Sequence, residues 1–164
     1  QANRVWGLRL NVYRLTKRIY ATPPSAAFSG RGSIDVSGRW NSRGRRMVYT
    51  SQSRALAALE TVVHLERPQL LGAEYVIIPA TVPDELIETV DLLALDVGWN
   101  NLTDLRATQK IGDAWLATGR SVALRVPTAL IPSEFNVLLS PEHPDWPSVS
   151  IAEAESFSFD SRLS

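Results

Sequence analysis

The chain has 164 residues, enough for one domain whose hydrophobic core needs neither a disulfide nor a metal to hold it together. Its 17 basic and 17 acidic residues cancel, so the net charge gives no reason to expect binding to nucleic acid or to an anionic membrane. The absence of cysteine excludes disulfides and thiolate metal sites, and two histidines are too few for a histidine-rich site, so we expect no metal.

The start of the chain predicts no targeting segment. Arg4 and Arg9 interrupt its apolar residues too early for the core of a signal peptide, and no apolar run reaches the length of a transmembrane helix. We therefore expect a soluble cytoplasmic protein without membrane contact. We assign residues 11–164 to a single domain and residues 1–10 to an N-terminal extension of no assigned function.

The first half of the chain predicts two strands, a long loop and a helix. Residues 10–16 alternate apolar and polar side chains and predict a strand. Residues 21–46 contain two adjacent prolines and four glycines, which predict an irregular segment, and loops of that length are usually functional or mobile. Residues 46–51 predict a short strand. A helix over about 53–66 follows, with Ser51 or Ser53 as its N-cap.

The second half is richer in strands. A helix is predicted over 103–118 despite Gly112, with Gly119 placed to end it. Because many strands accompany two clear helices without βαβ alternation, we expect an α+β fold around a mixed or antiparallel sheet. The strand candidates are residues 73–82, the weaker 86–92, 121–127, 134–140 and 155–163.

Glu60 has an unusual position in the first helix. At about 100° per residue with Leu56 at zero, the residues Leu59, Val62 and Val63 define an apolar arc, and Glu60 falls at about 40°, beside that arc. One interpretation is a boundary glutamate whose carboxylate reaches water. The other is a carboxylate that lines a cleft, where partial burial would strengthen its interaction with a cationic ligand.

Several motifs together resemble a known family. Arg39, Tyr49 and Glu60 follow one another at intervals of 10 and 11 residues in the frame GRWN…VYTS…ALE. VYRLT precedes them at 12–16, and LRVPTALIPSEFNVLLSPEHP follows at 124–144. This combination resembles the RES-domain family, bacterial toxins of toxin–antitoxin pairs that are named for a recurring Arg, Glu and Ser. The resemblance covers most of the chain.

Two positions depart from the family pattern. Thr128 stands where the family usually has serine in a VPSA-like turn, so the hydroxyl is kept but a methyl is added. Ser140 stands before Pro141 where the tail usually reads NPxHP, and it keeps a polar group. We expect these changes to tune the site rather than to remove it.

The resemblance implies a fold related to ADP-ribosyltransferase toxins and an enzyme that consumes NAD as its substrate, with no further cofactor. Members cleave the nicotinamide–ribose bond with phosphate or water as acceptor, or transfer ADP-ribose to a protein. It also implies a partner, a helix-turn-helix antitoxin of the Xre type that covers the active site in a hetero-oligomer. The sequence does not choose among the three acceptors.

The residue types fit that chemistry. Nicotinamide leaves as a neutral molecule while positive charge grows on the ribose, so Glu60 is the expected stabilising anion. Arginine forks match diphosphate oxygens, which suits Arg39 and Arg14, and the ring of Tyr49 can stack on the pyridinium. The implied site comprises Glu60, Arg39 and Tyr49 as catalytic residues and Arg14, Trp40, Asn41, Thr128 and Asn136 as NAD contacts.

Simpler interpretations remain open for these residues. Arg39 could be one more surface arginine, Tyr49 a core residue of its strand, Arg14 a solvated strand residue and Thr128 a turn residue. His143 is expected to be a structural loop histidine.

The five arginines from Arg31 to Arg46 form a basic segment that could bind phosphate, an acidic partner or nucleic acid. A binding module that uses this basic surface is therefore the non-enzyme alternative. Direct nucleic-acid binding is not expected, because the net charge is neutral and no nucleic-acid motif is present.

Overall fold

The computed structural model describes residues 7–163, apart from the side chains of Arg67 and Leu70. Eight strands form one sheet in the order β4-β5-β6-β2-β1-β3-β7, and β8 also pairs with β3. The strands are β1 (Arg9–Lys17), β2 (Val48–Ser51), β3 (Tyr75–Pro83), β4 (Ile87–Thr89), β5 (Ala123–Pro127), β6 (Phe135–Leu139), β7 (Ser150–Ile151) and β8 (Glu155–Phe157).

Four α-helices and several 3₁₀ turns connect the strands. The α-helices are α1 (Gly32–Asp35), α2 (Arg54–Val62), α3 (Arg67–Leu71) and α4 (Arg106–Thr118). The 3₁₀ turns are Arg18–Tyr20, Pro24–Phe28, Asp84–Leu86, Leu92–Ala94 and Trp146–Ser148. None of the helices within residues 7–163 is both long and apolar enough to cross a membrane.

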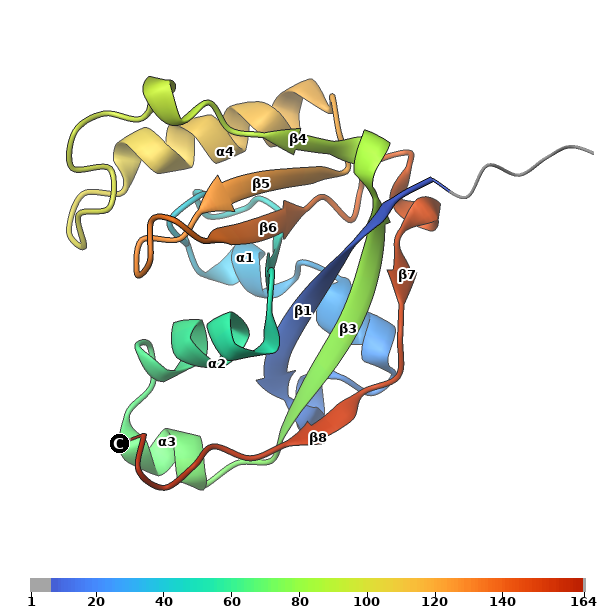
Figure 1. Cartoon of the computed structure of the whole chain (residues 1–164), viewed down its shortest axis with the longest axis vertical. Helices are drawn as coiled ribbons and strands as arrows, with labels where there is room; N and C mark the ends of the chain where they lie inside the picture. The colour runs from blue at the N-terminus through green and yellow to red at the C-terminus, as the bar shows by residue number, and fades with distance from the viewer. Residues whose placement is uncertain (1–6, 164) are drawn as a thin grey trace, which may run out of the picture.

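The sheet is mixed and strongly curved. Its strand pairs are antiparallel except β4 with β5, which is parallel. Figure 1 shows β5 and β6 running at a steep angle to β1 and β3, with α4 above the first pair and α2 beside β1. The expected single-domain α+β fold is confirmed.

The two parts of the sheet meet at one narrow junction. β1 pairs with β3 along nine residues, from Arg9 opposite Pro83 to Lys17 opposite Tyr75. By contrast, the register of β1 with β2 consists of the single pair Tyr13 and Ser51. The backbones of β1 and β2 therefore diverge beyond this pair, and side chains must close the space between them.

The expected elements agree with the structure in most places. The first helix ends at Val62 rather than near 66, and the short helix α3, which was not predicted, follows it with Glu66 and Gln69 forming a capping box. The last strand candidate, 155–163, was too long: β8 ends at Phe157. Beyond it, Asp160 accepts a hydrogen bond from the backbone N–H of Arg162, which turns the chain.

The core lies on both faces of the sheet. One cluster joins β1, β3 and β6 to the segment around Phe28, and a second packs Trp40 and Met47 against Trp115 of α4. Gly119 has a φ of 59° and caps the C-terminus of α4 in the left-handed conformation, so the predicted stop is confirmed.

Candidate active site

Helix α2 carries Glu60 on its inner side. Leu56 and Ala57 are buried, whereas Leu59 and Val63 are 39% and 48% exposed. The apolar arc inferred from the sequence was therefore misplaced, because the small residue Ala57 faces the core while two larger apolar residues face solvent. Since Glu60 falls between Leu56 and Ala57 on the helical wheel, it points toward the sheet.

The N-cap of α2 is Ser53, whose hydroxyl accepts the N–H of Leu56 at 3.1 Å. Ser51, the other cap candidate, has a different role. Its hydroxyl donates to Oδ1 of Asn136 at 2.8 Å, and Nδ2 of Asn136 donates to Oε1 of Glu60 at 2.7 Å. The carboxylate of Glu60 is thereby fixed from the sheet, and within the described residues no hydrogen bond engages Oε2.

Tyr49 of β2 holds the loop that contains the GRWN motif. Its hydroxyl donates to Oδ1 of Asn41 at 2.6 Å and accepts the backbone N–H of Trp40 at 3.1 Å. Burial raises the pKa of Tyr49 above its ordinary value. The phenol is therefore neutral at pH 7. Because its hydroxyl is engaged by the loop, the ring is the part of Tyr49 that can contact a ligand.

The glycine, tryptophan and asparagine of the GRWN motif each have a structural role. A Cβ on Gly38 would lie 2.5 Å from the hydroxyl of Tyr49, so only glycine fits there. Trp40 is 2% exposed and packs near Trp99, with ring centroids 6.1 Å apart, and Asn41 is fully buried. Trp40 and Asn41 therefore shape the wall of the site from within rather than present a surface to a ligand.

Arg39 connects this loop to a second one. Nη1 donates to the carbonyls of Trp99 and Asn101 at 2.9 and 3.1 Å, and Nη2 also donates to the carbonyl of Asn101 at 3.1 Å. Burial lowers the pKa of Arg39, while the negative charge of Glu60 acts in the opposite direction. Two of the five N–H groups, on Nε and Nη2, remain for an anion.

Arg14 of β1 is a partly buried cation, and no acidic side chain within residues 7–163 forms an ion pair with it. Nη1 donates to the carbonyl of Tyr49 at 3.0 Å, across the space where β1 and β2 diverge. Nε is enclosed and has no hydrogen-bond partner among the described residues. Burial lowers the pKa of Arg14 to about 10, so it keeps its charge at neutral pH. The solvated-strand interpretation of Arg14 is therefore wrong.

Thr128 and His143 complete turns. Thr128 is 1% exposed, and its hydroxyl accepts the N–H of Leu130 at 3.1 Å, just beyond the end of β5. No hydrogen bond described in the structure joins Thr128 to Glu60, Arg39 or Tyr49. His143 accepts the N–H of Asp145 on Nδ1 and contacts the carbonyl of Gly119 through Nε2, as a structural loop histidine would.

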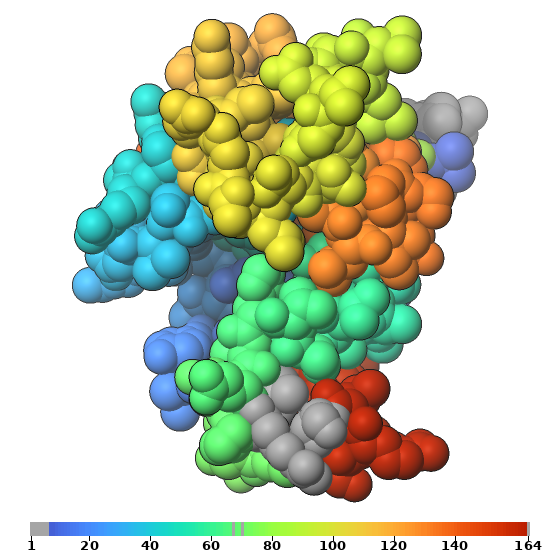
Figure 2. Space-filling view, turned by 90° about the vertical axis from the view of Figure 1, so that its left-hand side faces the viewer, coloured from blue at the N-terminus to red at the C-terminus, as the bar shows by residue number. Residues whose placement is uncertain are grey.

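The surface is hollowed between elements that carry several of these residues. Figure 2 shows a depression between the light-blue segment around residues 31–46, the yellow segment before α4 and the green helix α2. Glu60 belongs to α2 and Arg39 to the segment 31–46, two of the elements that border this depression, and the charge of Glu60 acts on Arg39. We call this depression the cleft.

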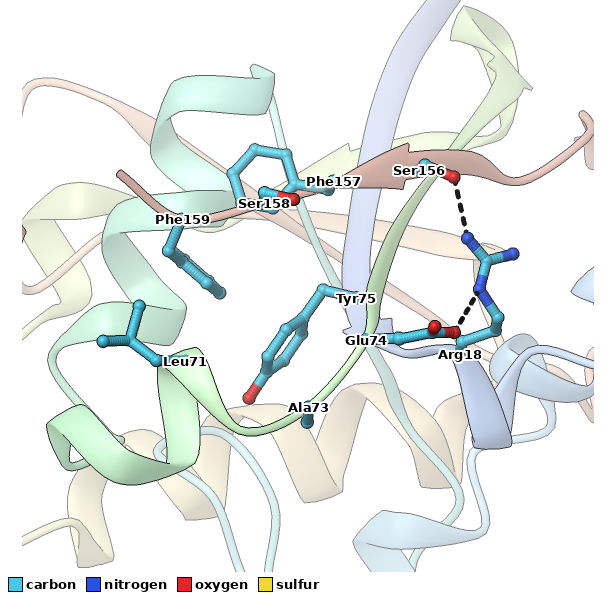
Figure 3. A pocket seen from close by; sticks show the side chains of 9 residues that line it. All are labelled: Arg18, Leu71, Ala73, Glu74, Tyr75, Ser156, Phe157, Ser158 and Phe159. Atoms are coloured by element: carbon cyan, nitrogen blue, oxygen red, sulfur yellow. Dashed lines mark hydrogen bonds and ion pairs between the residues drawn. The ribbon is translucent and has the colours of Figure 1, made fainter. Parts of the chain in front are cut away.

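A second depression lies elsewhere and differs chemically. It has a volume of about 370 Å³ and is lined by Arg18, Tyr75 and Phe159 among others. Figure 3 shows the guanidinium of Arg18 bound to Ser156 and paired with Glu74 at 3.2 Å. Glu74 therefore neutralises the positive charge of Arg18, whereas no described acidic side chain pairs with Arg14.

Sequence reasoning missed the involvement of Ser51 and of helix α4. Ser51 was considered only as a helix cap, because its place opposite Asn136 depends on the β2–β6 register, which one strand alone does not reveal. Helix α4 secures the GRWN loop, since Gln109 donates to the carbonyl of Gly38 and Asp113 binds Ser42. Between residues 7 and 163, no cluster of three or more His, Asp or Glu side chains is placed to hold a metal.

Comparisons with known proteins agree on one family. The RES domain model matches residues 11–160. The Toxin Res of Photorhabdus laumondii is 34% identical over 153 residues, which cover 93% of this chain and 96% of that protein. The Prs ADP-ribosylating toxin of a Sphingobium species is 36% identical over 138 residues, covering 82% and 85%.

A solved structure supports the fold independently. The crystal structure of the M. tuberculosis MbcT–MbcA toxin–antitoxin complex contains a chain that matches with a TM-score of 0.73 and 17% identity, covering 93% of this chain and 86% of that one. At this identity the match bears on the fold alone. The family model and the relatives show that the chain belongs to the RES-domain family.

Proposed function

We propose that the protein is a toxin that degrades NAD by cleaving the bond between nicotinamide and ribose. The proposal rests on the presence, in one region, of an oriented carboxylate and of a positive charge that no described acidic side chain neutralises. Within the described residues, Glu60 has one oxygen fixed by Asn136 and one free of hydrogen bonds, and the partly buried Arg14 has an enclosed Nε and no ion-pair partner. Such groups are costly to keep unless a ligand uses them.

Glu60 would stabilise the positive charge that grows on the ribose as nicotinamide departs. The leaving group is neutral, so no general acid is required. Oε2, the oxygen that Asn136 does not hold, is the one available to the ribose. A fixed carboxylate does not reorganise during the reaction, which is how preorganised charge lowers a barrier.

The two arginines would bind the diphosphate. Arg39 retains a side-by-side pair of N–H groups on Nε and Nη2, which suits two oxygens of one phosphate. Arg14 would add positive charge from strand β1. Tyr49 would contribute its ring by stacking on the pyridinium, since its hydroxyl is already used.

Transfer of ADP-ribose to a protein is the second candidate function. It is favoured by the name of one relative, the Prs ADP-ribosylating toxin, which is 36% identical. The bond that breaks is the same, and only the nucleophile differs. The non-enzyme alternative, a basic binding surface, has less support because Arg46 is paired with Glu142 at 3.1 Å and also binds the carbonyl of Ser29.

We further propose a hetero-oligomer with a helix-turn-helix antitoxin that covers the cleft. The solved structural neighbour is a toxin–antitoxin complex. Apolar side chains are exposed on two elements that border the cleft: Leu59 and Val63 on α2, and Leu102 on the segment that Arg39 holds. A bound partner would remove this apolar surface from water.

The test is NAD consumption by the purified protein, with and without phosphate, beside Glu60→Gln, which keeps the shape of the side chain and removes its charge. We expect NAD loss that the variant reduces by about 1,000-fold or more. Strong dependence on phosphate would identify phosphorolysis. NAD that stays intact without a protein target, but is consumed with labelled ADP-ribose appearing on an added target, would replace cleavage by transfer. If neither reaction occurs, the proposal is overturned.

A further inference from the structure

We propose that Asn136 is a positioning residue, held by Ser51, that aims the carboxylate of Glu60, rather than a direct contact of NAD. The inference rests on the proposed function and adds a role that the motifs alone do not give. Its basis is a continuous line of two hydrogen bonds across three elements, from Ser51 on β2 to Asn136 on β6 and on to Glu60 on α2.

The register of the sheet creates this line. Ser51 and Asn136 are direct partners in the antiparallel pair of β2 and β6, so their side chains project from the same face. Helix α2 begins three residues after Ser51 and packs over that face, which brings Glu60 within 2.7 Å of Asn136. The chain connection and the register together leave little freedom in where the carboxylate lies.

The chemistry allows one orientation of the Asn136 amide. A hydroxyl can donate, and a carboxylate can only accept when it is charged. The amide oxygen therefore faces Ser51 and the amide nitrogen faces Glu60. A flipped amide would place its oxygen 2.7 Å from Oε1, where two acceptors repel. Ser51, which is 5% exposed, thus acts on Glu60 through the amide, without touching it.

Both polar atoms of the Asn136 amide already have partners within the protein. One of its N–H bonds is directed at Oε1, and its oxygen is occupied by Ser51. Without this donor, the carboxylate would be free to rotate about the last bond of its side chain. A misplacement of about 1 Å at a reacting centre is enough to lower a rate about 100-fold.

Steady-state kinetics of four variants tests the inference. Asn136→Ala should lower kcat for NAD cleavage about 100-fold with KM changed by less than about twofold, because the ground-state contacts of NAD are kept. Ser51→Ala should lower kcat about 10-fold, and Ser51→Thr, which keeps the hydroxyl, should recover most of that loss. The double variant Ser51→Ala/Asn136→Ala should be no slower than Asn136→Ala alone, since Ser51 acts only through the amide.

Other results would overturn it. A rise in KM with kcat preserved in Asn136→Ala would make Asn136 an NAD contact, and additive losses in the double variant would separate Ser51 from it. Thermal unfolding of each variant identifies losses caused by poor folding. If wild type itself leaves NAD intact, the function fails and the positioning is tested by NMR. The side-chain amide signal of Asn136 must then shift in Glu60→Gln, and an unmoved signal would overturn the contact itself.

Discussion

Gly112 of α4 lies against the backbone carbonyl of Trp40. A Cβ built on Gly112 would be 1.8 Å from that oxygen, a distance no side chain can occupy. Helix α4 and the GRWN loop are therefore locked together at a glycine. The sequence shows only a helix with a poor helix former inside it, and the structure gives the reason.

This contact makes a sharp prediction. In an exposed helix interior, replacing glycine by alanine stabilises by about 1 kcal/mol. Gly112→Ala should instead destabilise by about 3 kcal/mol, because either the helix or the backbone of the loop must move. Urea unfolding followed by fluorescence measures the change. Gly32→Ala is the matched control, since nothing lies within 4 Å of a Cβ there. A stable Gly112→Ala variant would contradict the contact.

Arg14 should show opposite effects on stability and activity. Replacing it by methionine removes a partly buried charge that has no ion-pair partner within residues 7–163, while filling much of the same space. The free energy of unfolding should be unchanged or rise by about 1 to 4 kcal/mol, as for other buried charges replaced by apolar groups. NAD cleavage should fall at the same time, mainly through KM. A loss of stability together with unchanged kinetics would show that Arg14 serves the fold and not the site.

Tyr49 predicts a pH dependence of stability. Burial raises the pKa of its hydroxyl above the ordinary value of 10. Above pH 10 the unfolded chain releases this proton while the folded chain keeps it, so stability present below pH 10 is lost as pH rises, by about 1.4 kcal/mol per unit. The unfolding free energy of wild type should thus fall more steeply between pH 9.5 and 11 than that of Tyr49→Phe. Parallel curves would contradict the burial of the hydroxyl.

Arg39 should control the mobility of the segment that it holds. Its guanidinium binds the carbonyls of Trp99 and Asn101 from one end. Lysine keeps the charge but concentrates its donors at one nitrogen, so it cannot reproduce these bonds together with an anion contact. Arg39→Lys should increase amide hydrogen exchange in residues 99–104 and lower NAD cleavage. Unchanged exchange in that segment, measured by mass spectrometry, would separate Arg39 from the loop.

The exposed apolar residues beside the cleft should matter for the antitoxin and not for NAD. Leu59→Lys should weaken binding of the cognate antitoxin at least 10-fold, measured by calorimetry, because an apolar contact becomes a buried charge. NAD cleavage by the free protein should be unchanged. Leu8→Lys is the control, since Leu8 is 79% exposed and lies just before β1 rather than on an element that borders the cleft. Equal binding by all three proteins would exclude this face of α2 from the interface.

The sequence predicted the class of fold and most elements because strand alternation and helix periodicity are local. The face of α2 was misjudged because Ala57 carries a weaker apolar signal than Leu59, although Ala57 is the buried one. The motifs identified Glu60, Arg39 and Tyr49 as candidates, but they did not show that the hydroxyl of Tyr49 is hydrogen-bonded to the GRWN loop. Nor did they show Ser51 beside Asn136, since that contact depends on a register 85 residues apart in the chain.

The single pair of Tyr13 and Ser51 between β1 and β2 also bears on how the family can diversify. With so short a ladder, the angle between the two parts of the sheet depends on side chains that cross the junction. These include Arg14 at the carbonyl of Tyr49, and Arg54, which lies over the ring of Tyr13 and pairs with Glu155. The width of the cleft can therefore change through a few substitutions while every strand keeps its register, and under the proposed function this would admit acceptors of different size.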